Sequence, residues 1–334
     1  MRVITANGKN QQWRPNHTKQ KVPPHALQAP PKKNHDVPLF FELQDTESFC
    51  TVATKEFWRE AVLLVFSLRQ YHHEPIYVWC DKVVESKVRQ FCHTKDVHFI
   101  HGADEDELSR VRSTHFEGKL IQEWPRGDGG YSHVPWACYL KHRVVEFALE
   151  RHRTTFFLDA DVFAVAPCKE ALTSQLGCTP SWHNPRWDGV RPTYGAFNAG
   201  MLWCADPEFP AWWSEASLTR SAFMDQQCLD EAYHTFSVTI LSETQNFGFW
   251  RLWGAGKNLT EEDSLATVLT TVGLSVRDTI RFKERELQTF HVHPWCDNPC
   301  HKRLQEVVRF LLENSRQKEH NEVYALMSKL DGEG

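Results

Sequence analysis

The chain has 334 residues, 41% hydrophobic and 24% charged, and its 38 Lys and Arg against 43 Asp and Glu leave a net charge of −5. This much apolar material can build a large core in one or two domains. The acidic balance argues against a nucleic acid or an anionic membrane as partner, because either would need a basic surface.

The first 46 residues predict a flexible, polar N-terminal arm. This arm contains Pro pairs at 23–24 and 30–31 and lacks the hydrophobic run of a signal peptide. No later stretch approaches the roughly 18 consecutive apolar residues of a membrane span. These features predict a cytoplasmic protein with no transmembrane segment.

From residue 47 onward, strand and helix patterns alternate. Short apolar, β-prone runs indicate buried strands, and apolar residues spaced three or four apart indicate helices. Strands are expected at 49–54, 75–81, 97–101, 154–158, 194–204 and 288–293. Helices are expected at 56–70, 84–91, 136–151, 222–232, 304–312 and 323–330. This alternation predicts an α/β protein whose parallel sheet is covered by helices.

The sharpest chemical feature is the pair Asp159 and Asp161, directly after the apolar strand at 154–158. Open α/β sheets bind ligands at the carboxyl ends of their strands. Two neighbouring carboxylates repel each other unless a cation or hydrogen bonds compensate. Carboxylate oxygens suit Mg²⁺ or Mn²⁺, which would hold a diphosphate. The alternative is a turn with two capping Asp residues.

Four blocks in order resemble glycosyltransferases of the GT-A fold, of the glycogenin and lipopolysaccharide galactosyltransferase kind. They are the strand and helix over 51–68, Trp136 with Lys141, the segment 157–161, and 197–202 followed by Asp225-Gln226. The resemblance covers about residues 48–296. It implies a Rossmann-like, mostly parallel central sheet flanked by helices. The chain would then consist of the arm (1–46), a glycosyltransferase domain (47–300) and C-terminal helices packed on it (301–334).

The resemblance also implies an enzyme that depends on Mn²⁺ or Mg²⁺. Such an enzyme moves a sugar from a nucleotide-sugar donor, here expected to be a UDP-sugar, to the hydroxyl of a carbohydrate, lipid or protein acceptor. The resemblance implies retention of the anomeric configuration. An inverting enzyme would instead need a carboxylate base, for which Asp225 and Asp188 are the candidates.

The metal ligands implied by the resemblance are Asp159, Asp161 and a late His. The family's His, Gly, Lys, Pro-Trp motif is altered in this chain, where the Pro-Trp is kept and the Gly and Lys are missing. Both His291 and His293 are therefore candidate ligands, since residues two apart on a strand share a face. The missing Lys leaves a diphosphate contact unassigned, with these candidates to replace it: Lys141, Arg251, Lys257 and Lys302.

The other implied site residues fall into two groups. Those expected at the reacting sugar are Lys141, Asn198, Asp225 and Gln226, with Gln226 nearest the anomeric carbon. Those expected at the nucleotide are Thr54, Phe57, Asp81, Lys141 and Asp159. Aromatic residues in 182–188 and 247–253 are candidates for holding an acceptor.

Two other function classes fit parts of the pattern. A sugar nucleotidyltransferase shares the sheet and the metal site, but it would need a Gly-rich loop after the first strand, and residues 54–58 contain no Gly. A non-catalytic carbohydrate-binding protein could use the 13 Trp residues, but it would not require the paired Asp residues.

Overall fold

The structure is a computed structural model that describes residues 2–4, 10–12, 43–102, 134–181, 195–219, 221, 225–254, 263–296 and 299–333. The chain forms two units, residues 1–40 and 41–334. In the first unit, β1 (Arg2–Ile4) pairs antiparallel with β2 (Asn10–Gln12). The other helices and strands belong to the second unit. The division into arm, domain and C-terminal helices stays a prediction.

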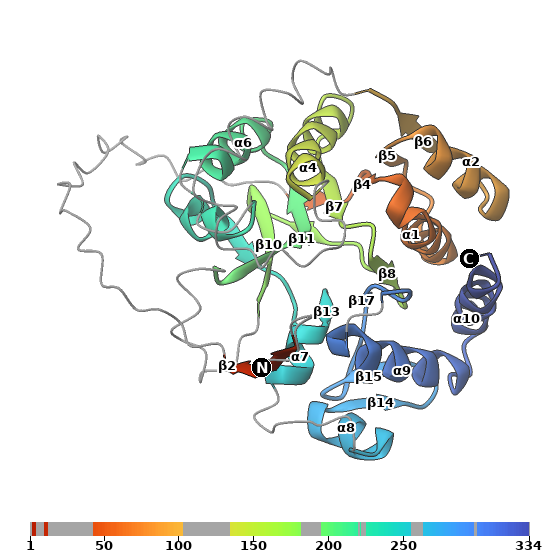
Figure 1. Ribbon diagram of the computed structural model, residues 1–334. Coiled ribbons are helices and arrows are strands. Elements are labelled where there is room, and N and C mark those ends of the chain that lie inside the picture. The colour runs from red at the N-terminus through yellow and green to blue at the C-terminus, as the bar shows by residue number, and fades with distance from the viewer. Residues whose placement is uncertain are drawn as a thin grey trace. The chain divides into compact units, whose positions relative to one another are not determined.

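A seven-stranded sheet of order β12-β10-β11-β7-β4-β5-β6 forms the centre of the second unit (Figure 1). Its strands are β4 (Phe49–Ala53), β5 (Ile76–Cys80), β6 (Val97–Ile100), β7 (Thr155–Leu158), β10 (Leu176–Pro180), β11 (Phe197–Cys204) and β12 (Val238–Ile240). The strands β7, β4, β5 and β6 are parallel, as are β10 and β12, and only β11 runs against both its neighbours. The predicted α/β class with a mostly parallel sheet is confirmed.

Alternating side chains of the strands supply the cores on the two faces of this sheet. Phe156 and Leu158 belong to one buried cluster, whereas Phe157 between them belongs to the other. In β4, Phe49 and Cys50 divide in the same way. Successive side chains of a strand point to opposite faces, so strands that are apolar at every position need cover on both sides.

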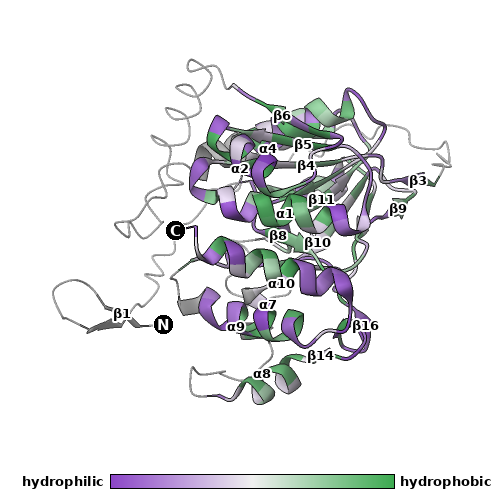
Figure 2. Ribbon diagram, turned by 90° about the vertical axis from the view of Figure 1, so that its right-hand side faces the viewer, coloured by the Kyte–Doolittle hydropathy of each residue, from purple (hydrophilic) through white to green (hydrophobic). Residues whose placement is uncertain are grey.

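Helices cover both faces. The first cluster includes residues of α1 (Trp58–Tyr71), α2 (Lys82–Phe91), α9 (Pro299–Glu313) and α10 (Lys318–Asp331). The second includes residues of α4 (Val134–Leu149) and α6 (Phe209–Thr219). Helix α1 contacts α2, α10 and the strand β8 (Val162–Ala164). These contacts on several sides explain why most of its side chains are apolar and buried. Figure 2 shows green, hydrophobic ribbon in α1 and the central strands, whereas α9 and α10 also carry purple, hydrophilic stretches.

Smaller elements complete the unit. One three-stranded sheet has the strand order β13 (Phe247–Gly248), β17 (Thr289–His291) and β8 (Val162–Ala164). Another has the strand order β14 (Leu274–Val276), β15 (Ile280–Phe282) and β16 (Arg285–Glu286). The strand β3 (Gln44–Asp45) pairs with β9 (Ala171–Leu172). The remaining helices are η1 (Lys55–Phe57), η5 (Gln227–His234), α7 (Phe249–Gly254) and α8 (Leu265–Val272).

The helix expected at 222–232 is different in the structure. Residues 222–224 lie outside the described part, and the segment Gln227–His234 is the 3₁₀ helix η5. In an α-helix the Asp225 carbonyl would accept from the Leu229 N–H, but it accepts instead from Trp213 Nε1 at 2.7 Å, and Leu229 N–H donates to Gln226 O. A tertiary contact therefore tightens this turn.

Among the helices of the described ranges, none combines the length and the apolar composition that crossing a bilayer requires. The cytoplasmic location stays a prediction.

His72, which ends α1, is a buried neutral imidazole. It is 1% exposed, and its Nε2 accepts a hydrogen bond of 3.1 Å from the backbone N–H of Cys168. Burial lowers the pKa of His72 from 6.5 to about 4, although the Glu74 carboxylate opposes this shift. The unfolded chain therefore binds a proton in a pH range where the folded chain does not.

We expect protonation of His72 in the unfolded chain to lower the free energy of unfolding as the pH drops from 6.5 towards 4. Between pH 7.5 and 5.0 the free energy of unfolding of the wild type should fall by about 2 kcal/mol more than that of His72→Gln. The Gln side chain does not titrate, so its unfolding is not coupled to proton uptake at this position. Urea unfolding of both proteins at the two pH values measures the difference. Equal losses in the two proteins would contradict the assignment.

Candidate active site

The paired carboxylates lie at the point where the order of the sheet reverses. The chain passes through β4, β5 and β6 in one direction and then returns to β7 on the other side of β4. Asp159 and Asp161 follow β7 at its carboxyl end, in a turn closed by a hydrogen bond from Val162 N to Asp159 O at 2.9 Å. This switch point is the usual ligand site of open α/β sheets.

Hydrogen bonds from other strands fix this turn. Asp159 N–H donates to Gly200 O in β11 at 2.8 Å, and Val292 N–H donates to Asp161 O at 2.9 Å. In the β17–β8 pair, His291 lies opposite Val162. The strand β17 therefore brings its last residue next to Asp161, although the two are 130 positions apart in the chain.

The three side chains Asp159, Asp161 and His291 form a group of possible metal ligands. One ligand atom from each lies within 4.8 Å of the others. Asp161 Oδ2 is 3.0 Å from His291 Nε2 and 3.1 Å from His293 Nε2. Both histidines that the sequence left as alternatives thus reach the same carboxylate oxygen. Carboxylate oxygens and an imidazole nitrogen fit Mn²⁺ or Mg²⁺.

The charges at this site are strongly coupled. Burial raises the pKa of the Asp159 carboxyl above its ordinary value, and the Lys141 ammonium offsets only part of this shift. Burial also acts to raise the pKa of Asp161, but His291 and His293 outweigh it and the net pKa is lowered. Burial lowers the pKa of His293, yet the carboxylates of Asp161 and Glu60 outweigh it and raise this pKa to about 9. A cation between the carboxylates would relieve the same repulsion.

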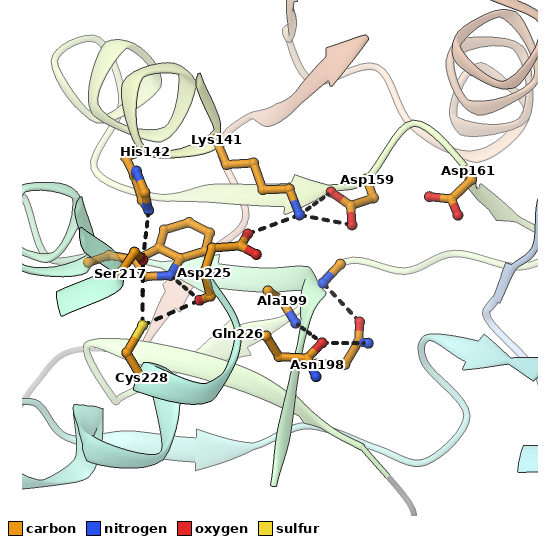
Figure 3. Close-up of polar contacts among 12 residues, drawn as sticks. Lys141, His142, Asp159, Asp161, Asn198, Ala199, Ser217, Asp225, Gln226 and Cys228 are labelled. Carbon is orange, nitrogen blue, oxygen red and sulfur yellow. Dashed lines mark hydrogen bonds and ion pairs between the residues drawn. The ribbon is translucent and has the colours of Figure 1, made fainter. Parts of the chain in front are cut away.

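Lys141 joins the metal group to the expected sugar residues. Its Nζ extends from α4 to within 2.9 Å of Asp159 Oδ1 and 3.0 Å of Asp225 Oδ2 (Figure 3). Asp225 is 3% exposed, and Trp213 Nε1 holds its backbone carbonyl at 2.7 Å. The structure therefore brings together three residues that the sequence analysis assigned to one site.

Asn198 and Gln226 also contact each other. Asn198 Nδ2 donates to Gln226 Oε1 at 3.1 Å, and Ala199 N–H donates to the same oxygen at 3.4 Å (Figure 3). Because β11 is antiparallel to β7, the first residues of β11 lie beside the carboxyl end of β7. The antiparallel strand thus carries these amides to the edge of the sheet that holds the carboxylates.

The expected nucleotide contacts divide into two kinds. Thr54 and Phe57 follow β4 at the switch point, and the Phe57 ring lies 5.4 Å from the His293 ring. Asp81 caps helix α2 by accepting from Val83 N at 2.8 Å and from Val84 N at 3.0 Å. This cap gives the Asp81 carboxylate a structural role, and its contact with a nucleotide stays a prediction.

Of the remaining candidates for a diphosphate or acceptor contact, some lie within the described residues and some lie outside them. Arg251 is 5% exposed, and its guanidinium donates to Gln245 O at 3.1 Å. Lys302 lies on α9. Lys257 and the expected acceptor residues of 182–188, including Asp188, lie outside the described residues.

Further residues, which no sequence pattern assigned to this role, support His291. Asn246 Oδ1 lies 2.7 Å from His291 Nδ1, and the rings of Trp250 and His291 meet edge to face with centroids 4.9 Å apart. Gly200 leaves room for the imidazole, since a Cβ there would lie 2.3 Å from His291 Cε1. Gly200 was found in the 197–202 block, but no periodicity or motif spacing pointed to Asn246.

Comparisons with known proteins give matches only at the level of structure. No protein-family model matches the chain, and no curated protein matches it in sequence. The galactosyltransferase LgtC, solved with donor and acceptor sugar analogues, is 12% identical with a TM-score of 0.49, over 83% of this chain and 99% of LgtC. The glycosyltransferase GlyE of Streptococcus pneumoniae is 14% identical with a TM-score of 0.46, over 86% of this chain and 64% of GlyE.

Mouse xyloside xylosyltransferase 1 is 12% identical with a TM-score of 0.42, over 76% of this chain and 99% of the mouse protein. These three structures belong to glycosyltransferases, the class of enzyme that the chain resembles in its motifs.

We expect Gly200→Ala to displace the imidazole of His291. The added Cβ would also lie 2.8 Å from Asn198 Oδ1, so overpacking should lower the free energy of unfolding by about 1–3 kcal/mol. Mn²⁺ affinity should fall about tenfold or more, as measured by calorimetry.

Gly332→Ala is the matched control, because a Cβ at that position meets nothing closer than Lys329 O at 3.6 Å. If the two variants bound Mn²⁺ equally well, Gly200 would not be the constraint on His291.

Proposed function

We propose that this protein is a metal-dependent glycosyltransferase that moves a sugar from a UDP-sugar to an acceptor hydroxyl with retention of anomeric configuration. The observation that carries the proposal is the grouping of Asp159, Asp161 and His291 at the switch point of the sheet, in contact through Lys141 with the carboxylate of Asp225. The fold and the motifs in the chain support the same class of enzyme.

Asp159, Asp161 and His291 would hold the metal, and His293 stands beside them. Bound Mn²⁺ or Mg²⁺ supplies Lewis-acid stabilisation of the negative charge that develops on a departing diphosphate. Lys141 lies 11% exposed between two carboxylates, so its ammonium is held in a fixed position. A fixed cation beside the diphosphate needs no reorganisation during the reaction.

The surroundings of Asp225 argue against this residue as the base of an inverting enzyme, whereas the other candidate base, Asp188, lies outside the described residues. Asp225 Oδ2 is paired with Lys141 Nζ, and the residue is 3% exposed, so this carboxylate is a poor candidate for a base that takes a proton from an acceptor in solvent. In a front-face displacement, the bond from the anomeric carbon to the phosphate oxygen breaks while the bond to the acceptor oxygen forms. The departing phosphate oxygen takes the acceptor proton, and no carboxylate base is needed.

Asn198 and Gln226 would orient the sugar in this scheme. Gln226 Oε1 accepts from Asn198 Nδ2 and Ala199 N–H, so the orientation of this carboxamide is fixed. A side chain held in this way keeps its geometry before the donor binds.

We expect the purified protein to release nucleotide from at least one sugar nucleotide in the presence of Mn²⁺. A panel of UDP-, GDP- and ADP-sugars, followed by chromatography of the released nucleotide, identifies the donor. Asp161→Asn should lower the rate at least about 100-fold, because the carboxylate loses its charge at the metal. No release and no Mn²⁺-dependent nucleotide binding with any donor would refute the proposal.

We also expect Lys141→Met to separate metal binding from turnover. Removing the ammonium leaves both neighbouring carboxylates in place, so Mn²⁺ affinity should be kept or increase, whereas nucleotide release should fall about 100-fold. Calorimetry and a release assay measure the two effects.

Lys318→Met serves as the matched control, since the Lys318 side chain is 83% exposed and pairs only with Glu322 on its own helix among the ion pairs of the described residues. Turnover of the Lys141 variant at the rate of this control would exclude a role for Lys141 in the reaction.

A further inference from the structure

A buried carboxamide connects the candidate metal group to the candidate sugar residues. Asn246 is fully buried, and its side chain makes three hydrogen bonds. Its Oδ1 is 2.7 Å from His291 Nδ1, and its Nδ2 is 2.8 Å from both Thr179 Oγ1 and Asn198 Oδ1. A carboxamide can face its partners in two ways, so the chemistry of the neighbours must decide which end is oxygen.

The first neighbour that decides the orientation is Asn198. The backbone N–H of Gly200, which can only donate, lies 2.8 Å from Asn198 Oδ1. The Asn198 oxygen must therefore face the N–H of Gly200. Since that oxygen also faces Asn246, only the NH₂ end of Asn246 can complete a hydrogen bond there.

The second neighbour, Thr179, leads to the same orientation. Its hydroxyl donates to the backbone carbonyl of Met201 at 3.0 Å, and this leaves the Thr179 oxygen free only to accept. The Asn246 group that faces it must again be the NH₂ end. Two backbone groups that cannot exchange roles, Gly200 N–H and Met201 C=O, thus orient the carboxamide independently.

This orientation leaves Asn246 Oδ1 facing His291. We propose that Asn246 is a positioning residue that holds His291 with the proton on Nδ1, so that Nε2 faces Asp161 and the metal. The role of this imidazole as a ligand rests on the proposed function, but the protonation of Nδ1 does not. A hydrogen bond of this type on the outer nitrogen orients a ligating imidazole and raises its basicity.

Asn246 also couples the metal group to the sugar residues. Its NH₂ group holds Asn198, and Asn198 in turn donates to Gln226 Oε1. A single chain of polar contacts therefore runs from Asp161 through His291, Asn246 and Asn198 to Gln226. The backbone of Asn246 has φ 55°, in the left-handed region that Asn, Asp and Gly adopt most easily, which restricts the residues that suit this place.

Two substitutions distinguish the role of the Asn246 oxygen from the role of its NH₂ group. Asn246→Gly tolerates the positive φ but removes both ends, and Mn²⁺ affinity should fall about 10- to 100-fold. Asn246→Asp keeps an oxygen for His291 Nδ1 but places a second acceptor against Asn198 Oδ1. Its Mn²⁺ affinity should stay within about threefold of the wild type or increase, while nucleotide release falls at least about tenfold.

A purely structural role would make the two variants bind Mn²⁺ equally weakly, and that result would overturn the proposal. Wild-type affinity in Asn246→Gly would overturn it as well. Thermal unfolding of each variant without metal checks that the fold persists.

A second measurement needs neither metal nor substrate. In metal-free protein labelled with ¹⁵N-histidine, the His291 resonances are identified by their loss in His291→Gln. We expect Nδ1 to carry a proton in the wild type, and in Asn246→Gly we expect the imidazole to lose the Nδ1 proton and to keep a proton only on Nε2, beside Asp161. An unprotonated Nδ1 in the wild type would refute the proposal. If the wild type binds no Mn²⁺, the proposed function fails, but this readout still decides the role of Asn246.

Discussion

The repulsion between two half-buried carboxylates is the constraint on which the rest of the site depends. Asp159 and Asp161 stand two residues apart at the end of a fully buried strand, where solvent cannot screen their charges well. Around them the chain places an ammonium on Asp159 and two imidazoles on Asp161. These positive or protonatable groups come from segments separated by more than a hundred residues, so the fold must bring them together before the carboxylates can be tolerated.

Strand direction explains how the fold achieves this. The carboxyl ends of the parallel strands β4 and β7 meet at one edge of the sheet, and antiparallel β11 contributes its first residues to the same edge. The short β17–β8 pair then carries His291 to the turn after β7. Each element supplies its polar side chains at an end, while its middle is apolar and belongs to the core. The rigid core therefore fixes the relative positions of the polar groups.

Much of this arrangement could be predicted because local patterns reflect it. The apolar run before Asp159 identified a buried strand, and the alternation with helices identified the class of fold. Within the helix expected at 222–232, the described residues form the 3₁₀ helix η5 instead of an α-helix, because the Asp225 carbonyl accepts from Trp213 Nε1, a contact that a local pattern cannot reveal. The sequence also left His291 and His293 as alternatives, and the structure brings both to Asp161.

The sequence by itself determined the mostly parallel sheet, the position of the paired carboxylates and the residue types around them. These features follow from hydrophobic periodicity and from neighbours in the chain, both of which act over a few residues. Only the tertiary structure decided that Lys141 bridges Asp159 and Asp225, and that Asn246 stands behind His291. Those contacts join distant segments through single hydrogen bonds and ion pairs, whose partners depend on strand order and register and leave no repeating trace in the sequence.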